Sequence, residues 1–202
     1  MSEPVQISTP RERPVALRRA SGWLGRLALL GLLFAGWQDA FAAEESVSKE
    51  YQVKAAFLYN FTKFLDWPAQ SFGDADSPIV IGIFCPASFG AELQKIVADR
   101  RVNGRGLVVK QLETAAQASS VHLLFVCAPY DGQFAGIRSA IGMSPVLTVG
   151  ESDSFRASGG AIDFVLRDDK VRFEINMVAA EQAQVKVSSQ LQKLAITVRR
   201  AP

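Results

Sequence analysis

The chain contains few side chains that could catalyse a reaction or hold a metal ion. Its 202 residues include one histidine, His122, and two cysteines, Cys85 and Cys127. His122 lies inside the apolar run 121–126, where a hydrogen-bonded core imidazole is far more common than a catalytic base. Two cysteines without a CxxC pair, together with one histidine, are too few ligands for a structural zinc site. We therefore expect a protein that is not an enzyme and has no metal or other cofactor.

Two acidic pairs and one glycine-rich segment are the remaining candidates for chemistry. Asp168 and Asp169 fall in an expected turn, and Glu44 and Glu45 follow an expected cleavage site, so we interpret both pairs as solvated charge. The segment 150–160 (GESDSFRASGG) follows an expected strand end, a place where open α/β sheets bind small anions. Turn formation also explains its glycines, so a ligand site there is one of two open interpretations.

The first 42 residues have the pattern of a secretory signal peptide. Five arginines between Arg11 and Arg26 precede the apolar run 27–37, and the sequence Ala40-Phe41-Ala42-Ala43 follows. The apolar run is too short to cross a hydrocarbon layer of about 30 Å comfortably. We expect cleavage after Ala42 and a domain over residues 43–202 located in the periplasm. An uncleaved signal anchor is the alternative.

The charge of the protein depends on this segment. The whole chain has 22 Lys and Arg against 20 Asp and Glu, whereas residues 43–202 carry 17 of each. A chain without net charge has no general electrostatic attraction for nucleic acid or an anionic membrane. Nucleic acid is therefore not an expected partner.

Apolar periodicity after residue 42 alternates between helical and strand patterns. Residues 48–65 place an apolar stripe at helical spacing, with Ser48 as N-cap. Helices are also expected over 89–97, with Ser88 as N-cap, and over 133–141. Four apolar runs predict strands: 78–85, 107–111, 121–127 and 145–149.

Strands that alternate with helices predict a mostly parallel sheet with helices on its faces. We therefore expect a single Rossmann-like α/β domain. Its last third differs, because residues 161–166 and 171–175 are joined by Arg167-Asp168-Asp169-Lys170 and should form an antiparallel hairpin at one edge of the sheet. Short helices are expected at 176–183 and 188–194.

Six segments, in order along the chain, resemble one known family. They are EYQVKAAFLYNFTKF (50–64) with Trp67-Pro68, VNGR (102–105), PVLTVG (145–150), GGAI (159–162), VRFEIN (171–176) and SSQL (188–191). These segments resemble the YfiR family of exported bacterial proteins.

The resemblance to the YfiR family implies both a fold and a function. It implies a periplasmic α/β protein, often a homodimer, that represses a membrane-bound diguanylate cyclase by binding its periplasmic sensor region. Repression would keep cyclic-di-GMP low. Some relatives serve other membrane receptors, so a periplasmic small-ligand-binding module for another receptor is the alternative.

Cys85 and Cys127 each end a buried strand run. If the two strands are neighbours in a parallel sheet, their ends can bring the Cα atoms to the roughly 4.4–6.8 Å that a disulfide needs. An oxidising compartment favours the bond. We predict a Cys85–Cys127 disulfide, with two buried inert thiols as the alternative. Family members place cysteines at other positions, so the resemblance assigns no redox role to this pair.

A repressor without catalytic groups has to act by preferring one conformation of its partner. We expect the partner to bind the C-terminal module, defined here as residues 174–200, because its apolar residues do not all fit one buried stripe and polar residues surround them. The predicted partner-binding residues are Glu174, Met177, Ala180, Lys186, Val187 and Ser188. The alternative is that Met177 and Val187 cap the core.

Overall fold

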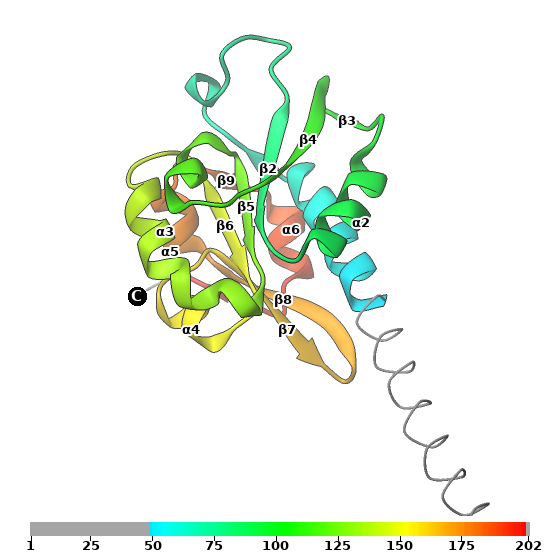
Figure 1. Cartoon of the computed structure of the whole chain (residues 1–202). Helices are drawn as coiled ribbons and strands as arrows, with labels where there is room; N and C mark the ends of the chain where they lie inside the picture. Colours follow the sequence, from blue (N-terminus) through cyan, green and yellow to red (C-terminus); the bar gives the residue numbers. More distant parts are fainter. Residues whose placement is uncertain (1–48, 201–202) are drawn as a thin grey trace, which may run out of the picture. The chain divides into compact units, whose positions relative to one another are not determined.

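The computed structural model describes residues 49–200. Their main feature is an eight-stranded sheet (Figure 1). Its strand order is β10-β8-β7-β6-β5-β2-β4-β3. The strands are β2 (Ile79–Phe84), β3 (Arg101–Val102), β4 (Arg105–Gln111), β5 (Leu123–Val126), β6 (Leu147–Gly150), β7 (Ile162–Arg167), β8 (Lys170–Asn176) and β10 (Thr197–Arg199).

The central strands β4-β2-β5-β6-β7 are all parallel. In chain order they follow the 2-1-3-4-5 arrangement of doubly wound α/β sheets. The predicted Rossmann-like, mostly parallel domain is therefore confirmed. The expected signal peptide (1–42) and the expected N-cap Ser48 lie outside the described residues.

Helices cover both faces of this sheet (Figure 1). The N-terminal helix (residues 49–62) and α2 (Ala87–Val97) pack on one face, and α3 (Phe134–Ile141) and α4 (Asp153–Ala157) pack on the other. Two short helices, α5 (Met177–Gln182) and α6 (Ser189–Leu194), lie in the C-terminal module. Three short 3-10 helices, η1 (Ala69–Ser71), η2 (Ala115–Ser120) and η3 (Ala128–Gln133), lie in the connections. None of the helices in residues 49–200 is long and apolar enough to cross a membrane.

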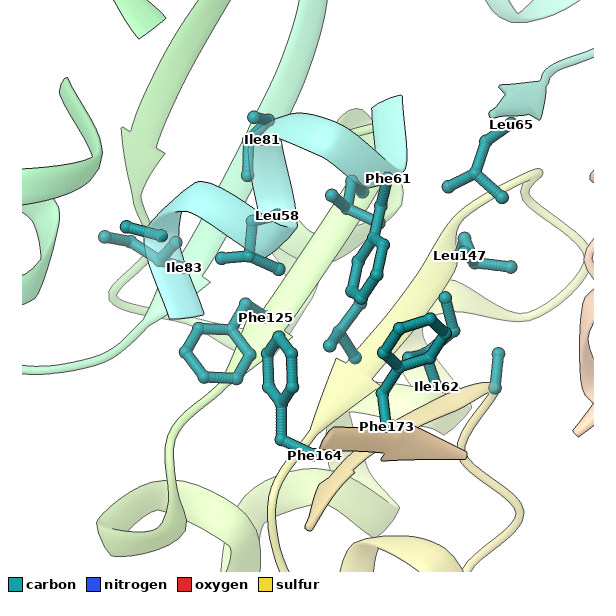
Figure 2. Close-up of a cluster of buried hydrophobic side chains, with 14 of the residues drawn as sticks. Leu58, Phe61, Leu65, Ile81, Ile83, Phe125, Leu147, Ile162, Phe164 and Phe173 are labelled. Carbon is teal, nitrogen blue, oxygen red and sulfur yellow. The ribbon is translucent and has the colours of Figure 1, made fainter. Parts of the chain in front are cut away.

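Aromatic rings fill the core between the N-terminal helix and the sheet. Figure 2 shows Phe61 of this helix directed toward Phe173 of the β7–β8 hairpin, and Leu58 directed toward Phe125 of β5. The ring of Phe61 stacks on Phe164 at 5.7 Å and meets Phe173 edge-on at 5.0 Å. Such pairs add specific geometry to the burial of apolar area. The apolar side chains that the sequence predicts on one face of the N-terminal helix thus pack this helix on the sheet.

The β7–β8 hairpin forms where the sequence predicts it. Asp168 and Asp169 have φ values of 51° and 56°, the left-handed conformation that a two-residue type I′ turn requires. The expected position at the edge of the sheet is wrong, because β10 pairs in parallel with β8 on its outer side. The expected N-cap Ser88 is also wrong: α2 begins at Ala87 and its N-cap is Pro86, whose ring fixes φ near the helical value.

A second, two-stranded sheet joins distant parts of the sequence. β1 (Leu65–Asp66) pairs antiparallel with β9 (Lys186–Val187). In addition, the Ser188 backbone N–H donates to the Phe64 carbonyl at 3.0 Å. The end of the N-terminal helix is thereby attached to the C-terminal module.

Candidate functional site

The carboxyl ends of β2 and β5 form the topological switch point of the sheet. After β2 the chain adds β4 on one side and then β5 on the other, and open α/β sheets bind ligands at such a point. Cys85 and Cys127 follow these two strands and form a disulfide with a Cα–Cα distance of 5.1 Å. The predicted disulfide is therefore present in the structure. It links the two strand ends at the place where a ligand would approach them.

A buried ion network lies beside the disulfide. Lys54 of the N-terminal helix forms ion pairs with Glu151, which follows β6, and with Glu50 one turn earlier in the helix. Glu151 also accepts a hydrogen bond of 2.7 Å from the backbone N–H of Ala128. Burial favours the neutral amine, but the two carboxylates outweigh it and raise the pKa of Lys54. The Glu50–Lys54 spacing is the only part of this network that the sequence signals, because Glu151 is almost 100 residues away.

Both ring nitrogens of His122 contact backbone groups of the fold. Its Nδ1 accepts a hydrogen bond of 3.0 Å from the Val80 N–H, and Nε2 lies 3.1 Å from the Ser71 carbonyl. This pattern assigns a neutral ring with the proton on Nε2. Burial lowers the pKa of His122, with a hydrogen bond to Ser71 opposing the shift. The ring also stacks on Phe72. Both nitrogens are used within the fold, so the ring is not positioned as a general base.

The segment 150–160 uses its polar groups within the fold. Ser152 caps α4 by accepting from the Phe155 N–H at 3.1 Å, and Ser154 donates to Asp131 at 2.7 Å. Arg156 forms ion pairs with Asp153 and Asp163. The expected ligand site in this segment stays a prediction, but these hydrogen bonds are those of a capped turn.

Two glycines in the same segment make room for a core aromatic ring. A Cβ atom would lie 2.2 Å from the Phe155 ring at Gly150 and 2.0 Å from it at Gly160. Both distances are far inside van der Waals contact. The packing of Phe155 therefore accounts for these two glycines.

The predicted partner-binding residues do not form one continuous surface. Ala180 and Val187 are buried in the core, and Glu174 is only 9% exposed. Met177 and Ser188 are half-buried, and Ser188 caps α6 by accepting from the Leu191 N–H. Lys186 alone is exposed. The burial of Glu174, Ala180 and Val187 corrects the expectation that they face solvent, whereas binding at the C-terminal module itself stays a prediction.

Two exposed apolar residues of the C-terminal module were missed from the sequence. Leu194, at the end of α6, is 64% exposed, and Ile196, just before β10, is 44% exposed. Ile196 is held in place by a hydrogen bond of 3.0 Å from its N–H to the Phe173 carbonyl of β8. The buried Leu191 one turn before Leu194 was the available signal, because a helix of six residues can bury only part of its apolar side chains.

A groove of about 430 Å³ lies between α3 and α5. Ile141, Thr148 and Ala183 are among the residues that line it, and Arg138 stands at its side. The Arg138 guanidinium donates to the Ser158 carbonyl but forms no ion pair with any residue of the described chain. The groove therefore combines an apolar lining with one cation that has no carboxylate partner.

Comparisons with known proteins place the chain in a family. A search among curated proteins found no match. Two solved structures share 13% and 11% sequence identity with TM-scores of 0.44 and 0.42: a conserved domain protein from Vibrio cholerae O1 biovar El Tor, and an ABC domain from Streptococcus pneumonia in complex with L-Trp. Each alignment covers 60% of this chain and 55% of the other, so the chain spans about half the length of those proteins. A family model described as DUF4154, YfiR/HmsC-like, matches residues 51–196, and the chain therefore belongs to the YfiR/HmsC-like family.

Proposed function

We propose that the protein is an exported repressor of an inner-membrane diguanylate cyclase. It binds the periplasmic sensor region of the cyclase, holds the enzyme in an inactive conformation and so lowers cyclic-di-GMP. The observation that carries this proposal is the family match over residues 51–196, since proteins of this family are periplasmic regulators. The resemblance also implies a homodimer, which light scattering of the purified domain would test.

Repression in this proposal depends on binding alone. A regulator changes the conformational equilibrium of its partner only through a difference in affinity between the two conformations. A preference of about 100-fold corresponds to about 2.7 kcal/mol. Apolar contacts of two or three well-placed side chains are sufficient for such a difference.

The C-terminal module supplies a surface of this kind. Leu194 and Ile196 are its exposed apolar residues, and the exposed Lys186 belongs to the polar residues of the same module. The hydrogen bond from Ile196 to β8 and the pairing of β9 with β1 fix the backbone on both sides of α6. A surface with a fixed backbone loses little conformational entropy on binding.

A pull-down with the periplasmic domain of the cyclase tests the proposal. Leu194→Asp places a charge in the proposed interface and should weaken binding at least tenfold while raising cellular cyclic-di-GMP. Met143→Asp is the matched control, because Met143 is also an exposed apolar residue but lies beside the α3–α5 groove. Unchanged binding by a folded Leu194→Asp protein would place the interface elsewhere. Absence of binding by the wild-type domain would contradict the function itself.

The alternative function, a small-ligand-binding module for another membrane receptor, is favoured by the α3–α5 groove. Its volume of about 430 Å³ is within the range of ligand pockets, and Arg138 provides a cation for an anionic group. Thermal-shift screening with amino acids and small carboxylates tests this alternative. A stabilisation that disappears in Arg138→Ala would support it.

A further inference from the structure

Two buried carboxylates lie next to each other near the end of the sheet. Asp163 of β7 and Glu174 of β8 are directly opposite in the antiparallel ladder, so their side chains point to the same face. Asp163 is 2% exposed and Glu174 is 9% exposed. Two neighbouring negative charges in such a place are unfavourable unless cations neutralise them or one carboxylate takes up a proton.

One guanidinium provides the direct neutralisation. Nε of Arg156 in α4 donates to Asp163 Oδ2 at 2.8 Å, and its Nη2 donates to Asp153 Oδ1 at 2.6 Å. Arg156 therefore shares its charge between Asp163 and the almost fully exposed Asp153. Glu174 forms no ion pair or side-chain hydrogen bond within residues 49–200. The cluster of three carboxylates thus contains a single bonded cation.

The other groups around the pair do not change this balance. Arg172 of β8 and Arg199 of β10 alternate onto the same face, one on each side of the pair along the strands. Neither of them bonds to either carboxylate among the described contacts. The residues opposite the pair on the neighbouring strands, Gly150 of β6 and Thr197 of β10, are uncharged.

One atom of the pair is arranged to carry a proton. Asp163 Oδ1 is fully buried and accepts no hydrogen bond from the described residues. Burial raises the pKa of Asp163; Arg156 opposes this shift, and the charges of Glu174 and Asp153 add to it. Protonation of Oδ1 would remove one buried charge. It would also turn an acceptor without a partner into a donor for the carboxylate on the opposite strand.

We propose that Asp163, which lies opposite Glu174 in the ladder, takes up one proton as the surroundings become acidic and thereby stabilises the β7–β8–β10 end of the sheet. β8 holds β10 by backbone pairing and holds Ile196 by the Phe173 carbonyl. Uptake of the proton therefore makes the C-terminal module more rigid. This part of the molecule becomes a surface whose order depends on pH.

The pH dependence of unfolding tests this pair. The carboxyl of an Asp in an unfolded chain has a pKa of about 3.9. The pKa of Asp163 in the folded protein is higher. The added stability is therefore complete below about pH 4 and is lost as the pH rises through the native value. Asp163→Asn keeps an oxygen acceptor for Arg156 and cannot ionise. The ratio of the unfolding equilibrium constants, wild type over Asp163→Asn, should rise by up to about tenfold per pH unit within that window.

Two controls make the test specific. The ratio is measured at each pH because His122 titrates in the wild type and in the variant alike, and its contribution cancels. Asp153→Asn is the matched variant: it removes a carboxylate bonded to the same guanidinium, but Asp153 is 95% exposed. Its ratio to wild type should change little over the same window. A ratio for Asp163→Asn that is equally flat would overturn the proposal.

A measurement on the wild type alone covers the case in which the variant does not fold. Carboxyl ¹³C NMR of the labelled protein between pH 3 and pH 8 gives the titration midpoint of Asp163 directly. The proposal requires a midpoint above that of an ordinary Asp. Amide hydrogen exchange at Val198 of β10, corrected for intrinsic rates, should be slower at pH values below this midpoint than at pH values above it. A midpoint at or below about 3.9 would contradict the proposed proton uptake by Asp163.

Discussion

Removal of the Cys85–Cys127 disulfide should cost much of the stability of this domain. The bond closes a loop with a sequence separation of 42 residues. In the chain-entropy model, a loop of that length lowers the entropy of the unfolded chain by about 13 cal/mol/K, which is about 4 kcal/mol at 25 °C. Both cysteines are buried in the same core cluster, and reduction keeps both sulfur atoms in that cluster. The loss should therefore come mainly from the unfolded chain.

Urea unfolding of the oxidised and reduced protein measures this loss. With a slope of about 2 kcal/mol/M, typical of a domain of this size, the midpoint should fall by about 2 M on reduction. The slope itself should increase, since an unfolded chain without the crosslink exposes more surface. The double variant Cys85→Ala with Cys127→Ala should be at least as destabilised as the reduced protein, because it also removes two buried sulfur atoms. A loss below about 1 kcal/mol would refute the argument from loop entropy.

Two other predictions follow from packing and protonation. Gly150→Ala should lower the free energy of unfolding by about 1–3 kcal/mol because its Cβ would overlap the Phe155 ring. Gly136→Ala should raise the free energy of unfolding by about 0.5–1 kcal/mol, because Gly136 is on the exposed side of α3 and no atom lies within 4 Å of the added Cβ. Thermal unfolding of both variants provides the comparison. Burial lowers the pKa of His122 below 6.5, so the stability that its neutral ring contributes is complete above about pH 6.5 and is lost as the pH falls through the native value. His122→Gln should lack this acid-dependent loss in a pH series of unfolding curves, and a ring titration midpoint above 6.5 in NMR would contradict the assignment.

The strands of the central sheet could be predicted because their own residues signal them. β2, β5 and β6 lie within continuous apolar runs, which is the pattern of strands buried on both faces. The disulfide also followed from the sequence, since each cysteine directly follows one of these runs. Once β2 and β5 are neighbours in a parallel sheet, the cysteines at their ends lie close enough to form the disulfide.

The very short strands could not be predicted in the same way. β1, β9 and β10 have two or three residues each, too few for any alternation of apolar and polar side chains to be visible. Their positions depend on partners more than 20 residues away in the sequence. This is also why the burial of Glu174 was missed: with β10 unrecognised, β8 seemed to be the open edge of the sheet.

The pairing of β1 with β9 has a consequence for the order in which the protein can fold. The N-terminal helix is synthesised before the strands of the sheet, but β1, which follows this helix, finds its partner β9 only about 120 residues later. Contacts between such distant parts of a chain form slowly, because a long loop must close before they are made. The β2–β5–β6 strands can assemble earlier, while the N-terminal helix stays without its final attachment and keeps apolar surface available to chaperones. β9, which is synthesised about 120 residues after β1, thus completes the attachment of the N-terminal helix.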